Sequence, residues 1–545
     1  MKFNFSRHNL QAAEQKLERF LEVIPGAISW FILIGLTVLS FVNPLAAAVI
    51  IIAFDLYWLL RLFYMNIFLV FSYSRLRLEA GTDWLQRLKG LDSMYEYWEE
   101  LKNKETSPGG KKDLSVLIHK EEIRILEKSK KFPPLSQEIY HLVIVPVARE
   151  SRNIIEPGVE SIARGKFPAS NILLVLAIEE TAPQASKEAA AIIQERYAQY
   201  FYDLLVTVHP SNIPGEAKVK GANATFAARK AAAYLENKNI PFENVVVSCF
   251  DADTVVAPDY FSCLTYRFMV SPDRTQASFQ PIPVYYNNIW ETPAFARVLD
   301  VGSSFFQLIE ATNPDRLVTF SSHSMSFKAL VDVGYWPVDM VSDDSAIFWK
   351  AFVHFNGNYR VVPLYVTLSM DVTEAENWWR TAVNVYKQKR RWAWGVENFP
   401  ILMRAFLQAE NIPLSKRLKH SFKMLESHIS WATWPFLLSI IGWLPAMFAG
   451  REFSHSILYY SAPRITGIIF SLASLGLLVC IILSILLLPK QKTKFSFFKK
   501  IGHAFEWLLV PPISIFLSAL PALDAQTRLM LGKYMEFWVT VKKRK

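Results

Sequence analysis

Apolar residues are concentrated in long runs near both ends of the chain. Residues 24–42 contain no charged side chain, and residues 44–60 contain only Asp55. Residues 429–449 and 465–488 are likewise free of charged side chains. About 20 apolar residues suffice to cross a bilayer, so each run predicts a membrane-spanning helix, and the first two predict a helical hairpin. A carboxylate is costly in lipid, so we expect Asp55 to face protein or water.

A further apolar run, residues 507–523, is interrupted by Pro511, Pro512 and Pro521. If this run crossed the membrane, the basic tail at 542–545 would lie outside the cell, against the preference of Lys and Arg for the cytosolic side. A re-entrant or interfacial segment broken at Pro511 and Pro512 would keep the tail inside, and we favour that arrangement. The five lysines between residues 490 and 500 predict a cytosolic loop.

From residue 141 the pattern changes to short β-branched runs. HLVIVPVARE, NILLVLAIEE, DLLVTVHP and NVVVSCFDAD predict four buried strands, and the segments between them predict helices. This alternation is typical of an α/β domain with a mainly parallel sheet and helices on both faces. The strand ends should gather along one edge of the sheet, where such domains bind ligands. The polar residues at these ends are Arg149, Glu150, Glu179, Glu180, His209, Asp251 and Asp253.

The remaining pattern completes a division of the chain into five parts. Residues 76–139 are charged and mostly helical in pattern, and residues 401–426 form a basic amphipathic segment that predicts a helix at the membrane interface. The predicted parts are an amphipathic N-terminus with a transmembrane hairpin (1–75), a cytosolic helical insert (76–139), the α/β domain (140–400), the interface helix (401–426) and a C-terminal transmembrane region with a basic tail (427–545).

Composition supports a membrane protein. The hydrophobic fraction is 52%, the mean hydropathy is +0.17 and the formal net charge is +10. These values exclude an ordinary soluble enzyme, and the basic residues cluster beside apolar runs, which favours anionic lipid and topology over nucleic acid as the reason for the charge. No motif for binding RNA or DNA is present. The three cysteines have neither metal-binding spacing nor the pattern of a disulfide framework.

Asp251 and Asp253 stand one residue apart at the end of the fourth predicted strand. Carboxylate oxygens are the ligands that Mg²⁺ and Mn²⁺ prefer, and such cations usually keep substrate phosphates in their shell. The pair therefore suggests a metal-assisted site for a nucleotide diphosphate. A solvated pair of acids at a strand-to-turn junction is the simpler alternative.

Five stretches, taken together, give this pair a context. The stretches are IVPVARE (144–150), KVKGANA (218–224), FDAD (250–253), VSDD (341–344) and QKRRW (388–392). On these residues the sequence resembles the processive, membrane-embedded family 2 glycosyltransferases, which include cellulose, hyaluronan and chitin synthases. FDAD matches the family's DXD motif, and QKRRW matches its QXXRW motif, which is the most specific. The resemblance covers about residues 142–395 and implies a GT-A domain, which transfers a sugar from a nucleotide-diphospho-sugar.

The resemblance implies a role for each motif. Asp251 and Asp253 would hold Mg²⁺ or Mn²⁺ on the donor diphosphate, and Asp344 would be the general base. Where the family has an aspartate for the nucleotide base, this chain has Glu179 and Glu180, which is a departure. The other residues expected to bind nucleotide or substrate are Pro146, Glu150, Lys220, Asn223, Asp251, Asp343, Gln388, Arg391 and Trp392.

Each motif also has a purely structural alternative. The two aspartates of VSDD could cap a helix, since acids are favourable at helix N-termini. The helix around QKRRW could lie on lipid headgroups, with Lys389, Arg390 and Trp394 as its anchors. His323 could serve a turn rather than contact an acceptor.

We therefore expect an integral membrane protein of the plasma (inner) membrane with a cytosolic catalytic domain. It would be an inverting glycosyltransferase that uses a nucleotide-diphospho-sugar, a UDP-sugar first among them, to extend and export a polysaccharide. Its acceptor would be a glycan or a lipid. Two alternatives are an enzyme that adds a single sugar to a membrane lipid and a non-enzymatic membrane transport subunit.

Overall fold

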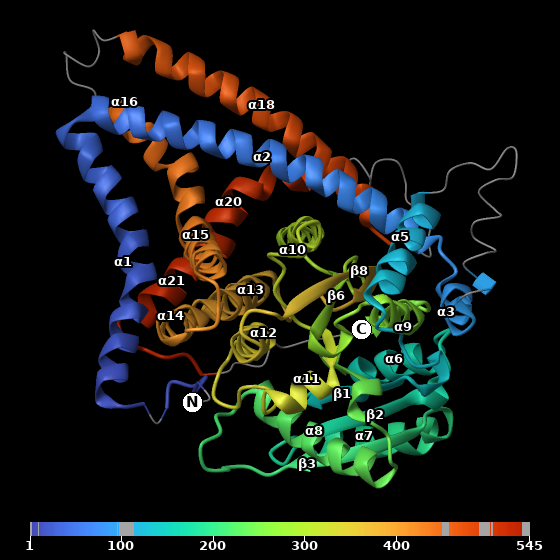
Figure 1. Cartoon of the computed structure of the whole chain (residues 1–545). Helices are drawn as coiled ribbons and strands as arrows, with labels where there is room; N and C mark the ends of the chain where they lie inside the picture. The colour runs from blue at the N-terminus through green and yellow to red at the C-terminus, as the bar shows by residue number, and fades with distance from the viewer. Residues whose placement is uncertain are drawn as a thin grey trace, which may run out of the picture.

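A computed structural model describes residues 3–8, 10–94, 96–97, 114–448, 457–489, 502 and 505–536. The predicted basic loop at 490–500 and the basic tail at 542–545 lie outside these residues. The described elements form a sheet domain surrounded on one side by long apolar helices (Figure 1).

The centre of the sheet domain is a mixed, mainly parallel sheet of eight strands in the order β3-β2-β1-β4-β7-β6-β8-β5. The first four strands in the chain pair in parallel, whereas β7 is antiparallel to both β4 and β6. The four predicted strands and the α/β fold class are confirmed. The strands are β1 (Tyr140–Val147), β2 (Ile172–Glu179), β3 (Asp203–His209), β4 (Val245–Cys249), β5 (Val255–Val256), β6 (Ala277–Val284), β7 (Ser324–Ser326) and β8 (Arg360–Ser369).

Helices cover both faces of the sheet, as the β-branched runs predict. In β1, Val143 and Val145 join one apolar cluster, while Leu142 and Ile144 join another on the opposite face. The first cluster takes residues from α6 (Arg152–Ala163), α7 (Gln184–Tyr197) and α9 (Tyr260–Val270), and the second from α8 (Lys220–Asn237), α11 (Phe327–Asp332) and α12 (Asp343–His354).

Long apolar helices make this an integral membrane protein. Among the described residues, α1 (Ala12–Val42), α2 (Pro44–Ala80) and the helical turns of Trp507–Met530 are long and apolar enough to cross a membrane. The pair Leu414–Ser439 and Ile441–Met447 passes the same test but is bent by 43°. Helix α18 (Ile457–Leu487) runs alongside α2 (Figure 1).

The segment predicted as one interface helix at 401–426 is two helices instead. Helix α14 (Asn398–Gln408) ends before a turn, and α15 (Leu414–Ser439) begins directly after Pro413. A residue that precedes proline is restricted to extended backbone, which interrupts the helix at Ile412. Helix α15 continues past residue 426, the predicted end of the interface helix, to Ser439, and Ile440 is its C-cap. The short α16 (Leu444–Met447) follows.

Pro511 and Pro512 do not interrupt the last apolar run. They lie in the first turn of α20 (Val510–Ser514), where the missing N–H of proline has no intrahelical partner to lose. A π-helical turn, Ile515–Ala519, connects α20 to α21 (Leu520–Met530). Whether these turns span the membrane or lie at its interface remains a prediction.

The remaining helices connect these parts. The charged stretch after the hairpin contains α3 (Trp84–Asp92) and α5 (Leu114–Ser129), as its helical pattern predicts. Helices α10 (Ala294–Ala311) and α13 (Trp378–Ala393) lie between the sheet and the long apolar helices (Figure 1).

The apolar helices and the sheet domain share a core. Val219 and Val341, which precede α8 and α12, belong to the same buried cluster as Leu33 of α1 and Leu523 of α21. At the other end of the domain, the buried Arg267 of α9 pairs with Glu79 at the end of α2 and with Glu122 of α5. Asp55 is also buried against protein, as predicted.

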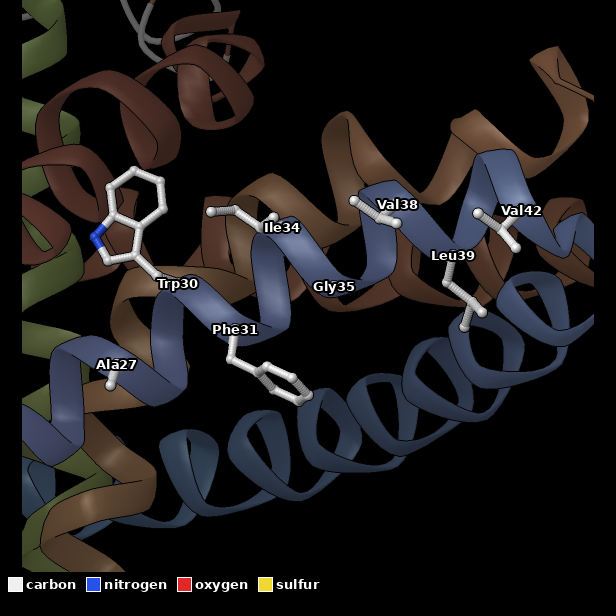
Figure 2. A pocket seen from close by; sticks show the side chains of 8 residues that line it. All are labelled: Ala27, Trp30, Phe31, Ile34, Gly35, Val38, Leu39 and Val42. Atoms are coloured by element: carbon white, nitrogen blue, oxygen red, sulfur yellow. The ribbon is translucent and has the colours of Figure 1, made fainter.

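One face of α1 remains uncovered by protein. Its side chains line a shallow apolar groove of about 600 Å³ that is formed by Ala27, Trp30, Phe31, Ile34, Gly35, Val38, Leu39 and Val42 (Figure 2). An exposed apolar surface on a helix of this length is expected where the helix meets lipid.

A close approach between α6 and the loop after β4 gives a test of the fold. A Cβ atom on Gly158 would lie 2.5 Å from the carbonyl oxygen of Thr254, so Gly158→Ala forces the backbone apart. We expect the free energy of unfolding to fall by about 1–3 kcal/mol, measured by thermal or denaturant unfolding. The control is Gly302→Ala in α10, where a Cβ atom would meet nothing within 4 Å. It should stabilise the protein by about 0.5–1 kcal/mol, and an equal response of both variants would contradict the prediction.

Candidate functional site

The candidate site lies at the carboxyl ends of the central parallel strands. Asp251 follows β4, Lys220 is the first residue of α8, and Asp343 and Asp344 are the first residues of α12. Residues from the second, third and fourth predicted motifs are therefore brought together at one edge of the sheet.

Lys220 joins two of the predicted functional carboxylates. Its Nζ lies 2.8 Å from Oδ1 of Asp251 and 3.1 Å from Oδ1 of Asp344. Burial alone would lower the pKa of Lys220, but the two carboxylates outweigh it and raise the pKa well above its usual range. The ammonium group thus stays charged and holds two acids in one place that would otherwise repel each other.

Gly221 allows α8 to begin where Lys220 can make these contacts. A Cβ atom at this position would lie 2.4 Å from the carbonyl oxygen of Pro337 and 2.9 Å from Cβ of Asp343. The glycine therefore permits a close backbone approach to the loop before α12.

Asp251 and Asp253 have different environments. Asp251 is partly exposed, and its carboxylate accepts a hydrogen bond from the hydroxyl of Ser321. Asp253 is only 1% exposed, and its Oδ2 accepts a hydrogen bond of 2.8 Å from the backbone N–H of Asp371. The described residues contain no group of three or more His, Cys, Asp or Glu arranged to hold a metal. The two aspartates fit a divalent cation whose other ligands come from substrate and water.

Asp343 is buried and Asp344 is partly exposed, just as Asp253 is buried and Asp251 is partly exposed. Asp343 is 3% exposed, and among the described residues its Oδ2 has no hydrogen-bond partner. Burial, followed by the nearby charge of Asp344, raises the pKa of Asp343 well above its usual range. The side chain of Asp344 is 24% exposed and can reach a ligand. Ser342, the residue directly before α12, makes no side-chain capping hydrogen bond to this helix.

His323 lies beside Asp344 and also serves a turn. Its Nδ1 donates to the carbonyl oxygen of Phe320 over 3.0 Å and lies 4.0 Å from Oδ1 of Asp344. Burial lowers the pKa of His323, so the ring is neutral near pH 7. The turn contact is the one predicted from the sequence, and a contact of this histidine with an acceptor stays a prediction.

Helix α13 is bound within the protein rather than spread on lipid headgroups. Lys389 is buried, with Nζ 2.9 Å from Oδ1 of Asp300 and 3.6 Å from the centre of the Trp392 ring. Arg390 forms an ion pair of 2.8 Å with Asp524 of α21, and Trp394 is fully buried. The interpretation of these three residues as lipid anchors is therefore wrong, because acids and apolar residues of the same chain surround them.

The residues of QKRRW proposed to meet substrate lie on the same helix. Gln388 is buried, and its Oε1 has no hydrogen-bond partner among the described residues. Trp392 is half-buried, and its ring centre lies 6.4 Å from that of Tyr285. Burial and Asp344 raise the pKa of Asp343, and the charge of Arg391 partly opposes that rise. Arg391 therefore lies near the α12 end of the site.

The residues proposed at the first two strand ends are held by local contacts. The carboxylate of Glu150 accepts hydrogen bonds from the N–H groups of Ala148 and Arg149. Pro146 lies within β1, opposite Ala177 of β2. Asn223 donates to the carbonyl oxygen of Ala177 over 2.8 Å, which fixes α8 on the sheet.

The two glutamates after β2 are not equivalent. Glu179 pairs with Nδ1 of His209 over 3.0 Å, while Nε2 of the same ring lies 2.9 Å from Glu216. Glu180 is exposed and accepts hydrogen bonds from the hydroxyl and N–H of Ser211, which lower the pKa of its carboxyl. Glu180 is thus the more accessible of the two.

Glu397 is a buried acid at this site that sequence analysis missed. Its Oε1 accepts hydrogen bonds from the N–H and hydroxyl of Ser342, the residue directly before Asp343. Its Oε2 accepts from the indole N–H of Trp394 over 2.8 Å and from Arg7. The only sequence signal is a carboxylate within the apolar segment that follows QKRRW.

Comparisons with known proteins fit this architecture. Residues 246–488 match the family model described as "Glycosyl transferase family group 2". Poly-beta-1,6-N-acetyl-D-glucosamine synthase of Staphylococcus aureus (strain COL) is 30% identical over 189 residues, which cover 34% of this chain and 42% of that protein. The Staphylococcus epidermidis protein of the same name is 28% identical over 197 residues, or 35% of this chain and 43% of the relative. This chain thus spans less than half the length of these relatives.

Solved structures are more distantly similar. Mannosyltransferase PcManGT from Pyrobaculum calidifontis, in complex with GDP-Man and Mn²⁺, is 15% identical with a TM-score of 0.35. The match covers 76% of this chain and 99% of that one. S. aureus TarS 1-349 in complex with UDP is 12% identical with a TM-score of 0.35, and the match covers 62% and 90% of the two chains.

The burial of Asp343 predicts a dependence of stability on pH. The pKa of Asp343 lies at its ordinary 3.8 in the unfolded chain and well above that value in the folded chain. Between these two values the folded chain binds more protons, so the stability due to Asp343 falls as pH rises. Asp343→Asn should remove this fall. The measurement is thermal unfolding of both proteins from pH 4 to 8 with EDTA present, and a constant stability difference across that range would refute the expectation.

Proposed function

We propose that this chain is a family 2 glycosyltransferase with membrane helices, which transfers a sugar from a nucleotide-diphospho-sugar to an acceptor hydroxyl with inversion. Repeated transfer would build a polysaccharide that is exported through the membrane helices. The observation that carries this proposal is the ion triad of Lys220, Asp251 and Asp344, which brings a leaving-group site and a candidate base to one edge of the sheet.

On the donor side, Asp251 and Asp253 would hold Mg²⁺ or Mn²⁺ on the diphosphate. When bound, the cation would supply Lewis-acid stabilisation of the charge that develops on the leaving group. The partly exposed carboxylate of Asp251 faces the ligand, whereas the hydrogen bond from Asp371 fixes the buried carboxylate of Asp253. Lys220 adds a positive charge next to this position and can meet a phosphate oxygen.

On the acceptor side, Asp344 takes the proton from the attacking hydroxyl. Its carboxylate is partly exposed, within reach of a ligand, and lies near the donor site through their common contact with Lys220. Asp343 is buried beneath it with a raised pKa, so it stays protonated further up the pH scale and does not compete for this role. The neutral ring of His323 adds no charge next to the base.

Helix α13 completes the site. Arg391 can bind the departing diphosphate with its planar fork. The neighbouring cations Lys389 and Arg390 pair with Asp300 and Asp524. Trp392 offers a flat surface to a sugar ring and is braced from one side by Lys389. Gln388 can hydrogen-bond an acceptor hydroxyl through its buried amide.

We propose a UDP-sugar as donor and UDP-N-acetylglucosamine as the first one to test, since the relatives are named for a poly-N-acetylglucosamine product. The exposed Glu180, with Glu150, Pro146, Glu179 and Asn223 along the same strand ends, would surround the nucleoside. The site would face the cytosol from the plasma (inner) membrane. We also propose that the chain is divided into the five parts predicted from the sequence, from the hairpin at 1–75 to the region at 427–545.

A glycosyltransferase that adds one sugar to a membrane lipid is the second candidate. It would use the same donor site and the same base, so the geometry of the ion triad fits both. The two differ in the size of the product.

The donor class and metal requirement can be tested together. Purified protein in nanodiscs is incubated with UDP-N-acetylglucosamine, UDP-glucose or GDP-mannose, and released nucleotide and product size are measured. We expect UDP release from a UDP-sugar, its loss with EDTA and its recovery with Mg²⁺ or Mn²⁺. A ladder of long products supports a polymerase, whereas a single added sugar supports the lipid-modifying alternative. Undiminished transfer in EDTA would reject the metal-binding role of Asp251 and Asp253.

Asp344→Asn tests the assignment of the base. The amide keeps the size of the side chain but cannot take a proton, so transfer should fall by about 10²–10⁴-fold. The affinity for UDP, measured by calorimetry, should remain close to that of the wild-type protein. The matched variant is Asp332→Asn, which changes an exposed ion pair with Lys328 and should leave transfer unaffected. Wild-type transfer rates in Asp344→Asn would eliminate it as the base.

A further inference from the structure

The residues before α1 form an ordered strap on the sheet domain. Residues 3–8, called the N-terminal strap here, are held by the fully buried Arg404 of α14, which donates to the carbonyl oxygens of Asn4 and Ser6 over 3.2 and 2.8 Å. The side chain of Phe5 is buried in the core that covers one face of the sheet. The strap lies beside α14 and α21, where the N-terminal end of the chain is marked in Figure 1.

Arg7 of this strap meets the acid that holds the start of α12. Its guanidinium donates to Oε2 of Glu397, whose Oε1 accepts from both the N–H and the hydroxyl of Ser342 over 2.8 and 2.7 Å. Ser342 is the residue directly before Asp343 and two before Asp344. The chain of contacts therefore runs from the strap through one carboxylate to the backbone that carries the proposed base.

A second contact fixes the same loop from its other side. The hydroxyl of Ser6 donates to the carboxylate of Asp339, four residues before Asp343. The strap thus holds the loop 339–342 at both of its ends. Pro337, two residues before this loop, supplies the carbonyl that Gly221 approaches, so the segment 337–342 is packed between the strap and the start of α8.

Because Arg7 and Glu397 are largely buried, their ion pair tolerates little change in geometry. Glu397 is 0% exposed and the side chain of Arg7 is 14% exposed. A buried carboxylate that loses its cationic partner must find another partner or move toward water. Because Glu397 also holds Ser342 and the indole of Trp394, its movement would displace both the start of α12 and the end of the QKRRW helix.

We propose that Arg7 is a positioning residue, which through Glu397 sets the place of Asp344 relative to the donor site. The proposal rests on the proposed function, in which Asp344 is the base. Because the strap leads directly into α1, it also ties the position of the first membrane helix to the geometry of the reacting groups.

The test compares turnover with nucleotide binding in the full-length protein. With UDP-N-acetylglucosamine as donor in nanodiscs, Arg7→Ala should lower kcat by about tenfold while the Kd for UDP, measured by calorimetry, changes by less than about twofold. Arg7→Lys keeps the charge and should recover most of the turnover. In a Glu397→Gln background, Arg7→Ala should add less than about a twofold loss, because the two residues act as one unit.

The matched control is Arg297→Ala. Arg297 forms a similarly buried ion pair with Glu506, over 2.9 Å, that also joins the sheet domain to the apolar helices but does not touch the loop before α12. It should lower the unfolding temperature while leaving kcat close to that of the wild-type protein. If Arg7→Ala does not fold, Arg7→Gln takes its place, since it keeps an N–H donor to Glu397 but no charge.

Two results would overturn the proposal. One is an unchanged kcat in folded Arg7→Ala, or in Arg7→Gln where it takes its place, and the other is a parallel loss of UDP affinity in that variant, which would indicate general disruption of the site. Failure of the proposed function would look different, since the wild-type protein itself would then transfer no sugar.

Discussion

The site depends on one ammonium group that lies between two carboxylates. Lys220 holds Asp251 and Asp344 within 3.1 Å of a single nitrogen, although the two acids come from a strand end and a helix start on different parts of the sheet edge. Two carboxylates this close together repel each other. The parallel order of the central strands brings these acids to one edge, and the positive charge of the lysine offsets their repulsion.

The ammonium group in turn depends on backbone packing. Lys220 opens α8 directly before Gly221, where only a hydrogen atom fits against the carbonyl of Pro337. The same loop leads into α12 and is bound from the opposite side by Glu397 and the N-terminal strap. Because Val219 and Val341 of these segments belong to a core shared with α1 and α21, the reacting groups and the apolar helices form one packed unit.

Local pattern predicted the elements better than their ends. β-branched runs such as Val245–Val247 need burial on both faces, so the strands, the α/β class and the motif-bearing edge followed from the sequence. Interruptions depended on finer chemistry: Pro413 splits a predicted helix, while Pro511 and Pro512 start one. The acidic and basic motifs could be placed at one edge because strand ends are a local feature.

The sequence could not predict which residues of the site pair with other residues of the chain. Whether Lys389 faced lipid or Asp300 depended on a helix almost 90 residues away, and neither residue's type reveals the pairing. The same holds for Glu179, whose partner His209 is the last residue of the neighbouring strand β3. The pairing of Glu397 with Arg7 could not be found, since a single acid within an apolar segment and a single distant base have no periodicity and no motif that joins them.

The N-terminal strap has a consequence for the order in which the protein is made. Arg7 and Glu397 are 390 residues apart, so at the usual elongation rates of 5–20 residues per second Arg7 leaves the ribosome about 20–80 s before its partner. Arg404, which holds the backbone of the strap, emerges later still. During that interval α1 and α2 can enter the bilayer while the strap has no place to dock. The N-terminal strap therefore forms its contacts with Glu397 and Arg404 only after most of the chain between them has been synthesised.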